Sequence, residues 1–264
     1  MKIGFIGCGN MGSAMLSGML ESGRVKPQDV LVTDKLLASR VNTQKKYGVD
    51  IAASNVELTM VADIIILAVK PQFYEEVLSE IKGALWPEKI LVSIAPGKTL
   101  AWMEEQIGKP AKIIRTMPNT PALVKEGMMG VCANKNVGKD ELELVCKLFH
   151  SFSKTEIVAE SLMDVVTAVS GSSPAYVFMF IEAMADAAVE GGMPRKQAYT
   201  FAAQAVLGSA KMVLETGTHP GELKDMVCSP GGTTIQAVRV LEEHGMRAAV
   251  MDAMKACIDK SRNM

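Results

Sequence analysis

Apolar and polar positions in the first part of the chain follow two patterns, short β-branched runs and stretches with helical spacing. The runs predict strands at Lys2–Ile6, Val30–Asp34, Asp63–Val69, Ile90–Ile94, Lys112–Thr116 and Thr155–Val158. The helical stretches lie at Met11–Leu20, Leu36–Tyr47, Phe73–Ile81, Leu100–Ile107 and Val137–Ser151. Regular alternation of strand and helix is typical of right-handed βαβ crossovers, so a parallel sheet is expected.

The pattern changes in the second part of the chain, where strand-like runs no longer occur. Long helical stretches, separated by glycine and proline, lie at Ser173–Glu190, Arg195–Glu215, Thr233–Glu243 and Met246–Arg262. Residues 175–181 are apolar all round. This run is too short for a membrane span, which needs about 20 apolar residues, so it predicts a helix that protein covers on every side. The sequence therefore predicts an α/β domain over residues 1–158 and an all-helical domain over residues 159–264.

Composition and charge exclude several classes of protein. The 264 residues include 28 Lys and Arg against 29 Asp and Glu, so no basic excess favours nucleic-acid binding. The five scattered cysteines and three histidines show no spacing typical of a metal site or of a disulfide scaffold, which fits a reducing cytoplasm. Because a strand pattern starts at once, we expect no signal peptide. A cytoplasmic protein without metal, membrane or nucleic-acid partners is expected.

Methionine is unusually frequent, at 19 residues against 7 Phe, 4 Tyr and 2 Trp. Ten lie in the helical half, at Met163, Met179, Met184, Met193, Met212, Met226, Met246, Met251, Met254 and Met264. Unbranched thioether side chains suit adaptable helix packing. A domain of about 100 residues can hardly cover an all-apolar helix alone. These helices therefore predict an intersubunit core and an obligate homodimer.

A glycine-rich motif stands between the first strand and the first helix. Gly7-Cys8-Gly9-Asn10-Met11-Gly12 matches GxGxxG. In this context the three glycines allow a tight turn, close approach of a pyrophosphate, and close helix packing, and the first helical amides hold the anion. A plain glycine turn is the alternative. The motif predicts a Rossmann-type domain that binds a dinucleotide.

Asp34 ends the second predicted strand, about 20 residues beyond the glycine motif. An acid there ordinarily accepts a hydrogen bond from the adenosine ribose 2′-hydroxyl of NAD and repels the 2′-phosphate of NADP. Lys35 and Arg40 follow closely and could offset that repulsion. Asp34 could equally be a helix N-cap. The sequence leaves the choice between NADH and NADPH open.

Two small-residue clusters precede predicted helices in the second half. Ser229-Pro230-Gly231-Gly232-Thr233-Thr234 offers bare backbone N–H groups, a helix start and three hydroxyls, which suit a small carboxylate. A plain helix cap with a left-handed glycine is the alternative. The second cluster, Ser170–Tyr176, favours a helix cap at Ser172 or Ser173 over a gap that faces a nicotinamide ring.

These motifs together resemble the pyrroline-5-carboxylate reductase family. The matching segments are IGFIGCGNMGSAM at 3–15, ILAVKPQ at 66–72, RTMPNTPA at 115–122, AVSGSSPAYVF at 168–178, HPGELKD at 219–225 and SPGGTTIQA at 229–237. The resemblance implies a Rossmann domain followed by a helical dimerisation domain that interlocks with its partner, often in larger rings such as a decamer. It also implies reduction of the C=N bond of 1-pyrroline-5-carboxylate to L-proline by NADPH or NADH, the last step of proline biosynthesis.

The resemblance assigns roles to residues of this chain. The residues implied to line the cofactor, beyond the glycine motif and Asp34-Lys35, are Asn55, Ala68, Val69, Lys70, Pro71, Ala95 and Gly97. Those implied to hold the cyclic imino acid are Ser229, Gly231, Gly232, Thr233 and Thr234. The Thr234 hydroxyl is expected to hydrogen-bond the ring nitrogen. Glu160 is expected near the substrate, where it either stabilises the iminium or caps local backbone.

The chain departs from the family pattern at two places. IAPG stands where AAG is more usual, so Pro96 is expected to stiffen the loop beside the nicotinamide. Asp34 replaces the small or amide residue that usually accompanies NADPH. Other cyclic imines, such as piperideine carboxylates, fit the same chemistry.

Two rival functions explain the sequence less well. A hydroxyacid dehydrogenase needs an acid/base, commonly a lysine on the helix after the small-residue cluster, but Tyr176–Gly192 contains none. A non-catalytic dinucleotide sensor would explain the glycine motif and gives no reason for the SPGGTT segment.

Overall fold

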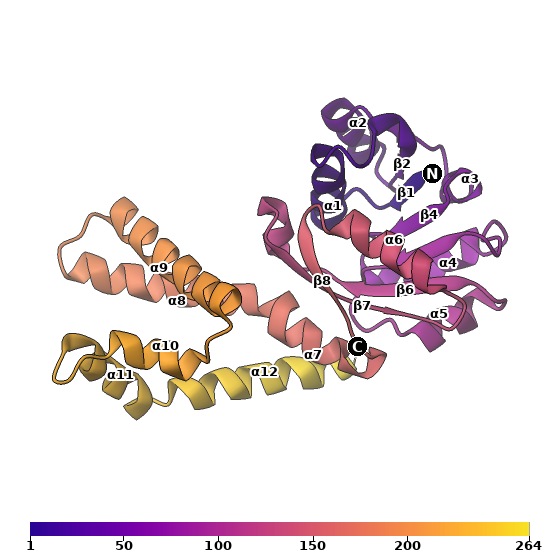
Figure 1. The fold of residues 1–264 in the computed structure, drawn as a ribbon. Coiled ribbons are helices and arrows are strands. Elements are labelled where there is room, and N and C mark those ends of the chain that lie inside the picture. Colours follow the sequence, from indigo (N-terminus) through magenta and orange to yellow (C-terminus); the bar gives the residue numbers. More distant parts are fainter. Residues whose placement is uncertain (264) are drawn as a thin grey trace. The chain divides into compact units, whose positions relative to one another are not determined.

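The computed structural model describes residues 1–263 and divides them into two compact units (Figure 1). The first unit comprises residues 1–172 and the end of the chain from Cys257, and the second comprises residues 173–256. Met264, the last of the ten methionines, lies outside the described residues. The first compact unit thus extends beyond residue 158, where the sequence places the domain boundary. The division into domains at residue 158 stays a prediction.

The first unit is built on an eight-stranded sheet in the order β3-β2-β1-β4-β5-β6-β7-β8. The strands are β1 Ile3–Ile6, β2 Val30–Thr33, β3 Asp50–Ile51, β4 Ile64–Leu67, β5 Ile90–Ser93, β6 Lys112–Met117, β7 Gly127–Ala133 and β8 Ser153–Ile157. The order 3-2-1-4-5-6 of the first six strands is that of the Rossmann fold, and all of them pair in parallel. The predicted Rossmann-type α/β class is confirmed.

One strand departs from the expected parallel sheet. β7, which has few β-branched residues and was not predicted, runs antiparallel to β6. The connection between the two strands holds only a short 3₁₀ turn, Thr120–Val124, and a parallel crossover needs a dozen or more residues. The chain therefore returns beside β6 in the opposite direction, and β8 then pairs with β7 in parallel.

Helices cover both faces of this sheet (Figure 1). They are α1 Asn10–Glu21, α2 Leu37–Tyr47, α3 Asn55–Val61, α4 Tyr74–Ile81, α5 Leu100–Ile107, α6 Lys139–Phe149 and α7 Met163–Val166. Along β4, Ile64 and Ile66 pack into one apolar core while Ile65 and Leu67 pack into the other. This strand is buried on both faces, as its unbroken apolar run predicts.

The helix after residue 160 does not begin at a serine cap. A 3₁₀ turn (Glu160–Leu162), α7 and a π-helical segment (Thr167–Ser172) lead directly into α8. The carbonyl of Ser170 would accept a bond from residue 174 in an α-helix, but Pro174 has no N–H. Asn119 Nδ2 donates to that carbonyl instead at 3.0 Å. The predicted cap at Ser172 or Ser173 is wrong because a long-range side chain stabilises a continuous helical path.

The second unit is entirely helical. Its helices are α8 Ser173–Glu190, α9 Arg195–Thr216, α10 Pro220–Val227, α11 Thr233–Glu243 and most of α12 Met246–Arg262. α8 and α9 lie side by side as a helical hairpin (Figure 1), with Ala185, Ala198 and Ala202 buried. α10 was not predicted because its first turn was interpreted as a separator. Pro220 occupies that turn, and His219 Nδ1 caps it by accepting the Gly221 N–H at 3.0 Å.

The second unit leaves large apolar side chains exposed on the single chain. Phe178, Met179 and Phe201 are 62%, 68% and 65% exposed. The apolar helix that should be covered on every side is thus not covered by its own chain, which leaves this surface for another molecule. Within residues 1–263, the helical stretch Glu160–Glu190 is long and apolar enough to cross a membrane. Core helices of soluble proteins meet the same criteria of length and composition.

Candidate active site

The predicted cofactor residues gather at one edge of the sheet in the first unit. Gly7 follows β1, Asp34 follows β2, Ala68 follows β4 and Ala95 lies just beyond β5. These four strands are neighbours and run in parallel, so their carboxyl ends meet at the same edge. Ligands of open α/β sheets bind outside this edge, where the strand order reverses between β1 and β4.

The glycine-rich loop has the geometry that its spacing predicts. Gly7 has φ +106°, and a Cβ there would lie 2.7 Å from the carbonyl of Ala68. A Cβ on Gly12 would lie 2.6 Å from the Gly7 carbonyl oxygen. A Cβ on Gly9 would meet no protein atom within 4 Å. Gly7 and Gly12 are therefore required by packing, whereas Gly9 borders open space that a pyrophosphate can approach.

The start of α1 offers free donors beside that open space. Gly9 is the N-cap, and no side chain caps the helix. The N–H groups of the first turn, from Asn10 to Gly12, have no carbonyl partner within the helix and carry its positive dipole end. The loop and helix start thus fit a dinucleotide pyrophosphate, although the assignment of single residues to the cofactor stays a prediction.

Asp34 is held by two backbone amides. Its Oδ2 accepts the Cys8 N–H from the glycine-rich loop at 2.8 Å, and its Oδ1 accepts the Leu36 N–H at 2.9 Å. The N-cap of α2 is Leu36, so Asp34 closes the turn before that helix and does not cap the helix itself. The carboxylate therefore links the end of β2 to the glycine-rich loop.

The remaining predicted cofactor residues follow β4 and β5. Lys70 is exposed, Pro71 opens a 3₁₀ turn (Pro71–Phe73), and Val69 is half-buried between them and β4. Beyond β5, Gly97 has φ +73°, a conformation that favours glycine. Asn55, at the start of α3, donates to Glu80 Oε2 at 2.7 Å. Its amide is thus engaged within the protein.

A buried tyrosine that the sequence did not single out ties these two loops together. The Tyr74 hydroxyl donates to the Leu67 carbonyl at the end of β4 (2.7 Å). It accepts from the Ile94 N–H and from Ser93 Oγ at the end of β5, both at 3.2 Å. Burial raises the pKa of this hydroxyl to about 12, so it stays protonated. The bonds join the strand ends from which Ala68 and Ala95 project.

Removing this hydroxyl is expected to loosen both loops. Tyr74→Phe keeps the ring but leaves the Leu67 carbonyl and the Ile94 N–H without this partner, so the free energy of unfolding should fall by about 1–3 kcal/mol. The KM for the cofactor should rise more than kcat falls. Urea unfolding and steady-state kinetics measure the two effects. Tyr199→Phe, on exposed α9, is the matched control, and equal stability of Tyr74→Phe and wild type would contradict the role.

Glu160 is engaged by two partners in the first unit. Its Oε1 lies 3.0 Å from Arg115 Nη1 and accepts the Leu100 N–H at 2.6 Å. Arg115 is only 4% exposed, so this carboxylate neutralises a buried charge and caps the first turn of α5. Arg115 was not predicted as a functional residue, although a lone charge within an apolar strand signals a buried partner. The geometry favours the capping interpretation of Glu160.

The SPGGTT segment forms an open helix start in the second unit. The Gly232 N–H donates to the Ser229 carbonyl at 3.0 Å, and Gly231 has φ +68°. Gly232 is the N-cap of α11, which has no side-chain cap. Within residues 1–263, no hydrogen bond is formed by the hydroxyls of Ser229, Thr233 and Thr234. Free amides and free hydroxyls at a positive helix end can bind a small carboxylate.

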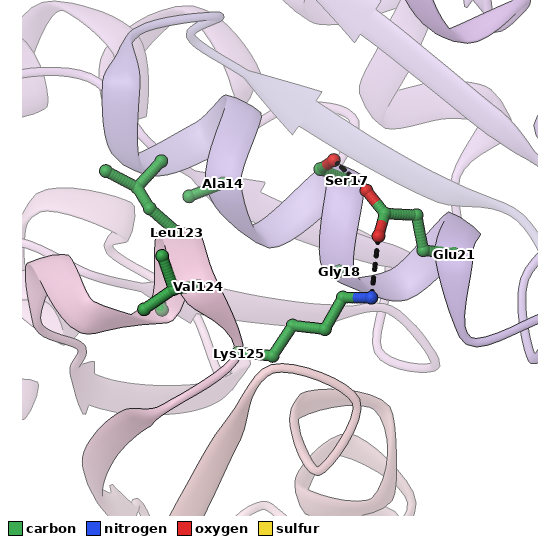
Figure 2. A pocket seen from close by; sticks show the side chains of 8 residues that line it. Ala14, Ser17, Gly18, Glu21, Leu123, Val124 and Lys125 are labelled. Carbon is green, nitrogen blue, oxygen red and sulfur yellow. Dashed lines mark hydrogen bonds and ion pairs between the residues drawn. The ribbon is translucent and has the colours of Figure 1, made fainter. Parts of the chain in front are cut away.

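The first unit also has a hollow outside the predicted site. Figure 2 shows it between the later turns of α1 and the 3₁₀ turn before β7. The volume of this hollow is about 240 Å³. The Lys125 ammonium lies 2.7 Å from Glu21, whose carboxylate also accepts the Ser17 hydroxyl at 2.7 Å. None of the predicted cofactor or substrate residues lines this hollow.

Two family comparisons cover most of the chain. Residues 160–264 match the sequence model described as "Pyrroline-5-carboxylate reductase dimerisation". Residues 2–97 match the one described as "NADP oxidoreductase coenzyme F420-dependent". The first region holds the open start of α11, and the second holds the glycine-rich loop.

Individual relatives extend the likeness over the full length. The pyrroline-5-carboxylate reductase of Escherichia coli strain K12 is 56% identical, covering 100% of this chain and 98% of the relative. That of Methanosarcina acetivorans is 46% identical over 100% and 97%. The crystal structure of Plasmodium falciparum pyrroline carboxylate reductase with NADP bound superposes with a TM-score of 0.90, at 36% identity, over 100% of this chain and 97% of the other.

Proposed function

The chain belongs to the pyrroline-5-carboxylate reductase family, and on this premise we propose that it reduces the C=N bond of 1-pyrroline-5-carboxylate to L-proline with NAD(P)H. The observation that carries the proposal is the full-length identity of 56% to a relative of that name. The open glycine-rich loop and the uncapped start of α11 support it, because they provide separate places for a pyrophosphate and for a carboxylate. The reaction is the last step of proline biosynthesis.

In the first unit, the chain binds and orients the cofactor. The first-turn amides of α1 hold the pyrophosphate, and Gly9 leaves room for it. Residues Ala68–Pro71 and Ala95–Gly97, braced by Tyr74, line the nicotinamide half. The bound cofactor supplies the hydride, while the protein contributes position and electrostatics.

In the second unit, the start of α11 binds the substrate. Its amides, with Ser229, Gly231 and Gly232, hold the carboxylate, and Thr233 lies beside them. The Thr234 hydroxyl hydrogen-bonds the ring nitrogen and orients or relays its proton. A protonated C=N bond is a strong electrophile, so this task requires orientation and no strong general acid. In this proposal Glu160 braces Arg115 and takes no part in the chemical step.

The test of this proposal is the Thr234→Ala variant. It should fold and bind cofactor normally, while kcat/KM for 1-pyrroline-5-carboxylate falls by about ten- to hundredfold, or about 1.4–2.7 kcal/mol of transition-state stabilisation. The assay follows NADPH or NADH absorbance, and Thr200→Ala on α9 is the matched control. Near-normal turnover in purified Thr234→Ala would refute the assignment of this hydroxyl.

The same assay tests the activity itself against its rivals. Wild-type enzyme should oxidise NADH or NADPH when 1-pyrroline-5-carboxylate is added. It should give no reaction with a 3-hydroxy acid and NAD⁺ or NADP⁺, because α8 offers no lysine as acid/base within Tyr176–Gly192. A dinucleotide sensor would bind the cofactor and turn over neither substrate.

The family places a self-association region in residues 160–264, and the exposed apolar side chains of the second unit agree with it. We propose further that two helical domains interlock, and that the dimers assemble into a larger ring such as a decamer. An intersubunit core would bury Phe178, Met179 and Phe201. The proposal also places the enzyme in the cytoplasm without membrane or nucleic-acid partners, which its five free cysteines and near-zero net charge support.

A further inference from the structure

We propose that this enzyme prefers NADH to NADPH and that Asp34 is the residue that decides the preference, an inference that rests on the proposed NAD(P)H-dependent reduction. Asp34 stands at the carboxyl end of β2, where a Rossmann domain contacts the adenosine ribose. A carboxylate there accepts a hydrogen bond from the 2′-hydroxyl of NADH. The same carboxylate repels the 2′-phosphate of NADPH.

The bonds of Asp34 keep its negative charge at this place. One carboxylate oxygen holds the Cys8 N–H (2.8 Å) and the other holds the Leu36 N–H (2.9 Å). Turning the carboxylate away from a phosphate would break both bonds and leave two amide donors without their acceptor. Each oxygen has further lone pairs, so a ribose hydroxyl can donate to it while the amides stay bound.

The two nearby cations are directed elsewhere. The Arg40 guanidinium donates to the Asp34 and Ala53 carbonyl oxygens, the latter at 3.0 Å. Lys35 is exposed, with its ammonium 5.7 Å from the centre of the Phe73 ring. A site built for a 2′-phosphate would aim a guanidinium fork at it. Here Arg40 braces two backbone segments.

The balance of these charges sets the expected size of the preference. A 2′-phosphate brings close to two negative charges beside a fixed carboxylate, and Arg40 returns one positive charge from a side chain already bonded to carbonyls. NADH loses nothing by this arrangement and gains the 2′-hydroxyl bond. The Kd of NADPH should therefore exceed that of NADH by about tenfold or more at moderate salt.

The experiment compares cofactor binding in Asp34→Asn with wild type. The amide keeps one oxygen acceptor and nearly the same shape, but removes the charge. Equilibrium titration of each purified protein with NADH and with NADPH, followed by nicotinamide fluorescence without substrate, gives the ratio of the two Kd values. The ratio should shift toward NADPH by about tenfold in Asp34→Asn. Asp50→Asn, which removes an exposed charge at the start of β3, should leave it unchanged.

Arg40→Gln completes the test. Arg40 both braces two backbone segments and returns one positive charge, so Arg40→Gln should weaken the binding of NADH and of NADPH, with the larger loss for NADPH. NADPH binding tighter than NADH in wild type, an unmoved ratio in Asp34→Asn, or a loss confined to NADPH in Arg40→Gln would each overturn the inference. Because these measurements need no imine, they stand apart from the reductase assay. If the enzyme reduces 1-pyrroline-5-carboxylate but prefers NADPH, the proposed role of Asp34 is refuted and the proposed reductase activity stands.

Discussion

Phe178→Glu is expected to abolish the homodimer and, with it, turnover. Phe178 lies on α8, where it is 62% exposed on the single chain among other exposed apolar side chains. Burying a carboxylate there without a partner would cost several kcal/mol. Because the second unit buries few of its own large side chains, we expect no stable folded monomer to replace the dimer.

Light scattering and sedimentation at low micromolar concentration measure this effect, and far-UV circular dichroism reports whether the helices persist. Met60→Glu places the same charge on an exposed apolar position of α3 in the first unit and should stay dimeric and active. A Phe178→Glu protein that remains a dimer with normal kcat/KM would show that α8 lies outside the interface. A folded, active wild-type species of one chain mass would refute obligate dimerisation.

Glu160→Ala should destabilise the first unit by about 3 kcal/mol. The change leaves the Arg115 side chain, which is 4% exposed, with a buried charge and no partner. It also removes the acceptor of the Leu100 N–H. This loss lies at the lower end of what breaking a buried ion pair costs, because the Glu160 side chain is 32% exposed and water can solvate part of the Arg115 charge in its place. Denaturant unfolding measures the loss.

This variant also separates the two interpretations of Glu160. As a brace it should leave kcat/KM within about threefold of wild type at temperatures where the variant is folded. If Glu160 instead stabilised the iminium, the fully folded Glu160→Ala variant would show a lower kcat than wild type. Arg115→Met combined with Glu160→Ala should recover part of the lost stability, because the unpaired buried charge is then absent. A double variant less stable than the sum of the single variants would contradict the pairing.

Local periodicity predicted most of the fold. Six strands follow from short β-branched runs, and the long helices follow from apolar residues spaced near 3.6 positions. β4 is an unbroken apolar run, and its alternate side chains lie in opposite cores. α3 and β3 were not predicted because they are short, at 7 and 2 residues, and so carry little periodic signal. α10 was not predicted because Pro220 and Gly221 in its first turn were interpreted as a separator.

Among functional residues, the sequence determined the glycine-rich loop, because the tight turn at Gly7 and the close helix start at Gly12 require glycine at a fixed spacing. It equally located an uncapped helix start at Gly232 and Thr233. Both features depend on neighbours in the chain or on one adjacent strand. Residue type and spacing are then enough to predict them.

Tertiary structure alone decided the interactions between distant residues. The Glu160–Arg115 pair, the Asn119 bond to the Ser170 carbonyl and the Tyr74 hydroxyl between two strand ends join segments 19 to 51 residues apart. No periodic pattern records which distant partner satisfies a buried polar group. The direction of β7 and the amides that hold Asp34 were settled in the same way, since packing must satisfy every buried donor and acceptor at once.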